Sequence, residues 1–90
     1  MSDAELDPMV RLLVELEQPF DPDRHYDFAP DALVRFALTA SDYWADKALD
    51  WLTFGCPIPP VEAELRHVAT DRDRPQALRH RTLRLLKHHS

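Results

Sequence analysis

Residues 41–54, SDYWADKALDWLTF, constrain the fold of this 90-residue chain more than any other stretch. They include both tryptophans, Trp44 and Trp51, which lie seven residues apart and therefore on the same side of an α-helix. Alanine and leucine residues around them widen this side into an apolar face. We therefore predict an amphipathic helix whose apolar face carries both indole rings and against which the other segments pack.

Three aspartates recur at every fourth position on a different side of the same helix: Asp42, Asp46 and Asp50. Neighbouring carboxylates at this spacing repel each other by roughly 0.2–0.5 kcal/mol, so a group of opposite charge is expected to offset the repulsion. Three interpretations are open: a solvated acidic face, pairing with arginines of the C-terminal region within the chain or across a dimer, and a divalent cation bound by carboxylate oxygens. Because one straight helix cannot surround a cation, we predict no metal site and no other cofactor.

The content of eight prolines and one glycine favours helices joined by proline-capped corners over a β-fold with tight turns. A first helix is predicted to begin at Asp7, with Pro8 at its first helical position, and to end before Pro19. Residues 18–29 contain two prolines and three aspartates, which disfavour regular structure. We expect the aromatic side chains of this segment to anchor it on the core as an ordered loop.

The remaining helices are predicted from their caps and from the spacing of their apolar residues. A largely buried helix begins near Pro30 and breaks at Ser41, a suitable N-cap for the tryptophan helix, although a continuous helix is an alternative. Gly55, the only glycine, ends the tryptophan helix at a position that favours positive φ. A fourth helix starts near Pro60, and a fifth runs from about Pro75 towards the C-terminus with a leucine-rich buried side.

Short corners place consecutive helices antiparallel. We therefore predict an all-α fold, a small bundle of four to five helices arranged as two antiparallel helical hairpins, with a solenoid-like stack of the hairpins as a variant. Ninety residues suffice for one hydrophobic core. Residues 1–90 are accordingly predicted to be a single helical domain with frayed ends at 1–6 and 88–90.

Charge is distributed unevenly along the chain. Residues 1–65 carry four basic and fourteen acidic side chains, a balance of −10, whereas residues 66–90 carry seven basic and two acidic ones, a balance of +5. Such a division favours either pairing within the chain or a basic surface that meets a partner. The predicted interaction surface combines the three aspartates with the exposed side of the last helix: Asp42, Asp46, Asp50, Arg79, His80, Arg84 and Lys87.

Catalytic motifs are not evident in the sequence. It lacks a glycine-rich phosphate loop, a GxSxG motif and an HExxH motif, and none of its five histidines lies three or four residues from another. Cys56 is the only cysteine, which excludes an intramolecular disulfide and fits a reducing compartment. We interpret it as a buried thiol and expect a protein that is not an enzyme.

The function that we predict is that of a small protein–protein interaction or self-associating module, with a homodimer as one form. Apolar side chains are expected to be partly exposed and to contribute to self-association at Phe20, Tyr26, Trp44 and Ile58. The alternative is a helix-turn-helix-like protein that contacts nucleic-acid phosphates through Arg79, Arg81, Arg84 and Lys87 of the last helix. A sequence pI of about 5.4 disfavours this alternative.

The location is predicted to be cytoplasmic, without a membrane partner. No apolar run approaches the roughly 20 residues that span a bilayer, and the N-terminal sequence MSDAELDP lacks the apolar centre of a signal peptide. Arginine outnumbers lysine by nine to two, which is typical of GC-rich coding sequences and indicates a bacterial origin.

Overall fold

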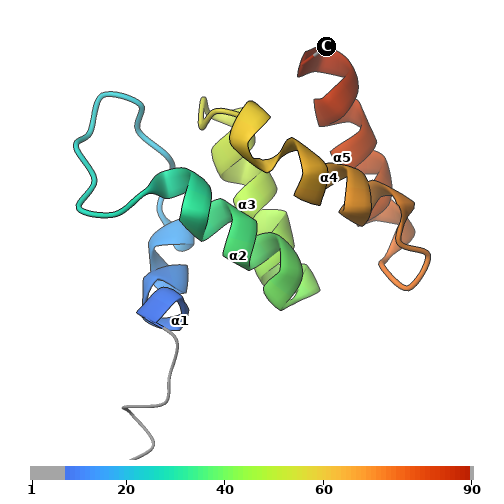
Figure 1. Cartoon of the computed structure of the whole chain (residues 1–90), viewed down its shortest axis with the longest axis horizontal. Helices are drawn as coiled ribbons and strands as arrows, with labels where there is room; N and C mark the ends of the chain where they lie inside the picture. Colours follow the sequence, from blue (N-terminus) through green and yellow to red (C-terminus); the bar gives the residue numbers. More distant parts are fainter. Residues whose placement is uncertain (1–7, 90) are drawn as a thin grey trace, which may run out of the picture.

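Residues 8–89, the part of the chain that this computed structural model describes, form an all-helical structure (Figure 1). The elements follow in the order α1 (Pro8–Leu12), the 3₁₀ helix η2 (Leu13–Glu17), α2 (Pro30–Ala40), α3 (Asp42–Thr53), the 3₁₀ helix η3 (Pro59–Val61), α4 (Glu62–Thr70) and α5 (Gln76–His89). No strand occurs within these residues. The predicted all-α class is confirmed.

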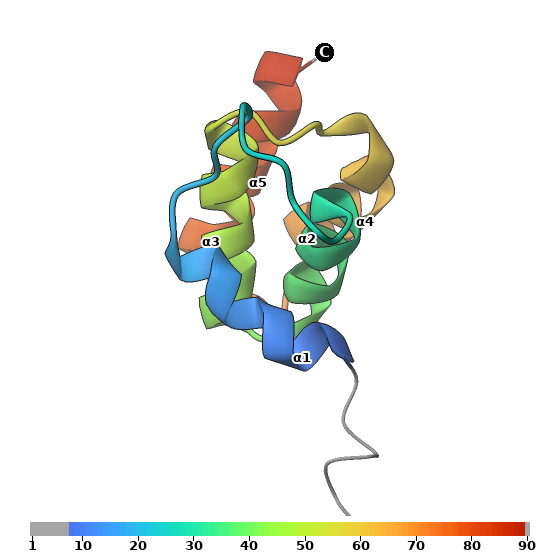
Figure 2. The same ribbon diagram turned by 90° about the vertical axis from the view of Figure 1, so that its left-hand side faces the viewer.

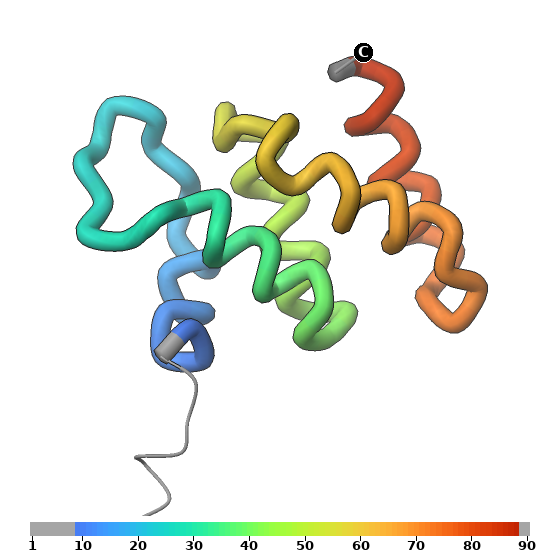
Figure 3. Tube along the Cα trace, viewed as in Figure 1, coloured from blue at the N-terminus to red at the C-terminus, as the bar shows by residue number. Residues whose placement is uncertain are grey.

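The longer helices pack in two layers, α2 beside α4 and α3 beside α5 (Figures 1 and 2). Each helix also packs on its neighbour in the other layer, α2 on α3 and α4 on α5, and these contacts are the more extensive ones. The Cα atoms extend over 41 × 33 × 19 Å. The shortest dimension fits two helix layers, because packed helix axes lie about 8–10 Å apart. The α1–η2 segment contacts α2 and α3 at the edge of the bundle (Figure 3).

A hydrophobic core joins the layers and draws residues from η2, all four longer helices and η3. Its largest fully buried side chains are Trp51, Leu33, Leu38, Leu49, Leu65, Val34, Val61 and Thr82. The hydroxyl of Thr82 donates a hydrogen bond to the Leu78 carbonyl at 2.8 Å, so this buried polar group is satisfied. The fifth helix thus buries the side that its sequence predicted.

Both ends of α3 are set by local hydrogen bonds. Ser41 separates α2 from α3, and its side-chain oxygen accepts a hydrogen bond from the Trp44 N–H at 3.3 Å. Gly55 follows the helix with φ of +120°. The amides of Gly55 and Cys56 donate to the carbonyls of Leu52 and Trp51 at 3.4 and 3.0 Å, which is the Schellman pattern. The predicted break at Ser41 and stop at Gly55 are confirmed.

The two tryptophans differ in burial. Trp51 is 1 % exposed, and its indole N–H donates to the Gln18 carbonyl at 2.8 Å. Trp44 is only half-buried at the margin of the core. Trp44 therefore agrees with the expectation that its side chain is partly exposed, whereas aromatic side chains of the loop of residues 18–29 surround Trp51.

The aromatic side chains of that loop surround Trp51. The ring centroids of Phe20, Tyr26 and Phe28 lie 5.2, 5.5 and 6.4 Å from that of Trp51. Phe20 also stacks on Tyr26 at 5.5 Å, and the Arg24 guanidinium lies 4.6 Å from the Tyr26 ring centroid. Edge and offset contacts of this kind each contribute about 0.5–1.5 kcal/mol beyond burial. The predicted ordered loop with aromatic anchors is confirmed.

The ends of the structure differ from the prediction in detail. The first helix changes from α to 3₁₀ at Leu13, and the Gln18 amide closes it by donating to the Glu15 carbonyl at 3.1 Å. A 3₁₀ turn of this kind is common where the chain leaves a helix for an extended residue. At the other end α5 continues through His89, which includes two of the residues predicted to be a frayed end. Asp7, residues 1–6 and Ser90 lie outside the described residues.

Candidate functional site

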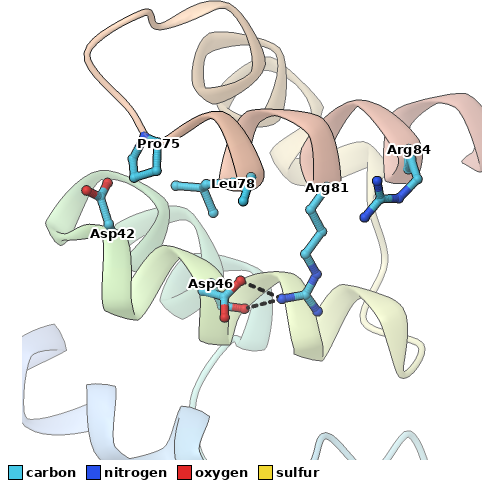
Figure 4. Close-up of a pocket in the computed structure, with 7 residues that line it drawn as sticks. Asp42, Asp46, Pro75, Leu78, Arg81 and Arg84 are labelled. Carbon is cyan, nitrogen blue, oxygen red and sulfur yellow. Dashed lines mark hydrogen bonds and ion pairs between the residues drawn. The ribbon is translucent and has the colours of Figure 1, made fainter.

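The candidate functional site is a groove between α3 and α5, called the α3–α5 groove below (Figure 4). Its larger part, of 440 Å³, is lined by Asp42, Asp46, Pro75, Ala77, Leu78, Arg81 and Arg84. Its smaller part, of 260 Å³, is lined by Thr53, Arg81, Arg84, Leu85 and His88. Arg81 and Arg84 border both parts, which therefore adjoin. The order of these residues shows that α3 and α5 run in the same direction.

The groove exists because α3 and α5 contact each other less extensively than each contacts its neighbour in the other layer. A side chain bridges the remaining space. The Arg81 guanidinium donates to the Asp46 carboxylate at 2.6 Å and to the Asp46 backbone carbonyl at 3.2 Å. Its second terminal nitrogen donates to the carboxylate of Asp50. One arginine thus holds two successive turns of α3.

The electrostatics of Arg81 favour its charged form. Partial burial acts to lower the pKa of the Arg81 guanidinium, but the hydrogen bonds to Asp50 and Asp46 outweigh burial and raise the pKa above its ordinary value. Arg81 therefore remains a cation throughout the normal pH range. Isolated exposed ion pairs contribute only about 0–1 kcal/mol, but a guanidinium shared by two carboxylates is also geometrically fixed.

Asp42 is paired in a similar way, with Arg74 from the corner between α4 and α5. The Arg74 guanidinium donates to the Asp42 carboxylate at 3.1 Å and to the Leu38 carbonyl in the last turn of α2 at 2.5 Å. All three aspartates therefore have an arginine partner within the chain. Of the three interpretations, intrachain pairing is the one observed. Between residues 8 and 89, no group of three or more His, Cys, Asp or Glu side chains could hold a metal ion.

The basic residues predicted for the interaction surface separate into two groups. The Arg79 side chain turns back along α5, where its Nε–H donates to the Arg74 carbonyl at 3.1 Å. His80, Arg84 and Lys87 are exposed, and none of their side chains has a hydrogen bond or ion pair with another described residue. Of these three, only Arg84 lines the α3–α5 groove. The groove thus has an acidic end, Asp42 and Asp46, and a basic end, Arg84 and His88.

The floor of the groove is apolar. Leu78 is buried with 5 % exposure, Leu85 is half-buried, and Pro75 and Ala77 are exposed beside them. Leu83, which precedes Arg84 on α5, is 43 % exposed. Apolar surface next to an unpaired guanidinium is a combination that protein-binding surfaces favour.

The four apolar residues expected to be partly exposed are so in the structure. Phe20, Tyr26, Trp44 and Ile58 are all half-buried and pack against the core. Among residues 8–89, the large apolar side chains with the greater exposure are Val10, Val14, Tyr43, Phe54 and Leu83.

The sequence indicates pairing of the aspartates with arginines of the C-terminal region as one interpretation, but it does not identify Arg74 and Arg81 as the partners. Arg81 is otherwise suggested as a phosphate contact. The position of Arg81 indicates that it can pair with a neighbouring helix. It lies three residues after Leu78 and next to Thr82, at the margin of the buried side of α5. A long cationic side chain at such a margin reaches the neighbouring helix.

Cys56 lies outside the groove and is buried with 2 % exposure, as predicted. Burial, with a smaller contribution from the negative charge of Asp31, raises the pKa of the Cys56 thiol to about 11. The thiolate that nucleophilic chemistry requires is therefore scarce at neutral pH.

Among the helices of residues 8–89, none combines the length and the apolar character needed to cross a bilayer. No protein-family model matches the chain, and the searches of curated proteins and of solved structures give no match. The function proposed next therefore depends on the geometry of the groove.

Proposed function

We propose that this protein is a non-enzymatic interaction module that binds another protein chain in the α3–α5 groove. The observation that carries the proposal is the state of Arg84. It is exposed, lines both parts of the groove and has no ion-pair partner among the described residues. The other charged residues of the larger part, Asp42, Asp46 and Arg81, are paired within the chain. A carboxylate of a bound chain would provide Arg84 with an ion-pair partner.

The length of the groove corresponds to that of a short helix. Its α5 wall extends over positions 75–88, which corresponds to about 20 Å at 1.5 Å per residue. An amphipathic helix of three to four turns would place its apolar side on Leu78 and Leu85, as in other helix-in-groove complexes. A glutamate or aspartate of that helix would lie against Arg84, since arginines beside apolar surface are frequent anchors of interfaces.

The proposal extends to the arrangement of the helices. We take α2–α3 and α4–α5 as two antiparallel hairpins that stack side by side in a solenoid-like way, so that the groove lies between hairpins. The single-residue corner at Ser41 and the extensive contacts within each pair support this view. Stacked hairpins commonly present binding surfaces between their repeats. The buried, unpaired thiol of Cys56 supports placement in the cytoplasm.

The test is site-specific photo-crosslinking in the cells that naturally express the protein. A photoreactive amino acid replaces Ala77, which is exposed in the groove, or Ala63, an exposed control position on α4. We expect a discrete protein adduct at position 77 and none at position 63. The adduct should be lost in Arg84→Glu and retained in the matched charge reversal Arg72→Glu outside the groove. Equal labelling at positions 77 and 63, or no adduct at either, would refute the proposal.

A second candidate function is nucleic-acid binding by α5. The observation in its favour is the exposed stripe of His80, Arg84 and Lys87 without carboxylate partners in the described part of the chain. Against it, Arg81 is occupied by two carboxylates of α3. A salt-dependent mobility shift with random duplex DNA, abolished by Arg84→Glu, would support this candidate, and no shift at low salt would exclude it.

A further inference from the structure

The charges of the α3–α5 groove are polarised along its length (Figure 4). Asp42 and Asp46 lie at the acidic end, and Arg84 lies at the opposite end. Despite their arginine partners, the side chains of Asp42 and Asp46 remain 53 % and 56 % exposed. Each carboxylate therefore retains an accessible side that can accept a second cation.

We infer that the chain bound in the groove is a second copy of this protein, packed antiparallel about a twofold axis. The inference rests on the proposed function and identifies its partner. A twofold axis across the groove reverses its direction, so the acidic end of one copy meets the basic end of the other. Arg84 of each copy then faces Asp42 of the second copy, and the pair forms twice. Self-complementary patches of this kind define isologous dimers.

The helix dipoles favour the same arrangement. Within one copy α3 and α5 run in the same direction, so their partial charges of like sign lie side by side. An antiparallel second copy places helix N-termini against helix C-termini and offsets this repulsion. The apolar floor around Ala77 and Leu78 lies between the two charged ends and would be covered by its counterpart.

Net charge does not prevent this contact. Each copy carries −5, but the Debye length at physiological salt is about 8 Å, so only the groups that face each other across the interface interact strongly. At both ends of the interface these groups, Arg84 and Asp42, are of opposite sign. A different protein would make both end contacts only if it carried an anion and a cation at the matching separation, whereas a second copy supplies both by symmetry.

The test is sedimentation of purified full-length chains that carry complementary charge reversals. Arg84→Glu places two carboxylates opposite each other at both contacts of its homodimer, and Asp42→Lys places two cations there. We expect each variant alone to dimerise about tenfold or more weakly than wild type. An equimolar mixture should regain dimers. In the mixed dimer the two substituted side chains, of opposite charge, meet at one contact, and the unchanged Arg84 and Asp42 meet at the other.

Controls separate folding from association. Helical content by circular dichroism is measured for every variant, and Arg72→Glu should dimerise like wild type. Asp42→Lys loses its pair with Arg74. If this variant is unfolded, Ala77→Lys takes its place, because Ala77 is exposed near Asp42 and a lysine there should repel Arg84 of the second copy and attract the glutamate of Arg84→Glu in the mixture.

The outcomes also distinguish this inference from the proposed function. A wild-type chain that remains monomeric at its highest soluble concentration overturns the inference, as does a mixture of variants that stays monomeric. An adduct between position 77 and a different protein in cells would leave the proposed function standing while the dimer fails. No adduct of either kind would refute both.

Discussion

Replacement of Trp51 by phenylalanine, compared with the same change at Trp44, tests whether the more buried tryptophan contributes more to stability. Both substitutions keep an aromatic ring, and each leaves one tryptophan as a fluorescent reporter. Trp51 is 1 % exposed and makes an indole hydrogen bond to the Gln18 carbonyl. Trp44 is half-buried. The sequence places both on one helix side, so a difference in cost must come from the tertiary structure.

The expected cost follows from the contacts. Trp51→Phe removes one hydrogen bond, which contributes about 1 kcal/mol, and leaves a cavity beside three aromatic rings that costs about 1 kcal/mol more. The sum is about 2 kcal/mol, or about 8–16 °C in Tm for a domain of this size. Trp44→Phe removes ring atoms that already contact solvent, so its cost should stay below about 1 kcal/mol.

The assay is urea unfolding followed by far-ultraviolet circular dichroism, with the midpoint and the slope fitted for each variant. Unchanged slopes indicate that the variants differ in stability and not in the compactness of the unfolded state. Fluorescence quenching by acrylamide gives an independent measure, because Trp44 should be quenched more strongly than Trp51. A cost for Trp44→Phe that equals or exceeds that for Trp51→Phe would refute this assignment of the core.

Three further predictions concern the turn, the groove and the thiol. Gly55→Ala should lower stability by about 1–2 kcal/mol in thermal unfolding, because φ of +120° strains any residue with a Cβ, and a wild-type Tm would contradict this. Arg81→Gln leaves Asp46 and Asp50 unpaired, so the free energy of unfolding from urea titrations should fall by about 1 kcal/mol at low salt and by less in high salt; a salt-independent loss would argue against an ionic cause. The raised pKa of Cys56 should make stability fall between about pH 9 and 11, where the unfolded thiol ionises and the folded one stays protonated, and Cys56→Ala should remove this part of the pH dependence in urea titrations.

The ends of the helices could be predicted from the sequence because the interactions that set them are local. Ser41 caps an amide three residues away, and the two amides after the end of α3 bond to carbonyls within the same turn. Pro30 begins α2 as expected, since its fixed φ suits the first turn. Hydrogen bonds between residues three to five positions apart can be predicted from the sequence alone.

The candidate site could be predicted only in part. The three aspartates stood out by their spacing, but that spacing fits a solvated face, an ion pair or a cation equally well. Their partners, Arg74 and Arg81, follow at least 31 residues later in the chain. The rotation of α5 relative to α3 determines which arginines reach α3. The same rotation leaves Arg84 unpaired among the described residues.

The sequence by itself determined that the chain is helical, where the longer helices begin and end, and which side of α5 is buried. Only the tertiary structure decided that Trp51 is enclosed while Trp44 stays at the margin, because the loop of residues 18–29 folds over one end of α3. It also decided which opposite charges meet. Periodicity fixes the faces of each helix, but the packing of the common core sets the positions of those faces relative to one another.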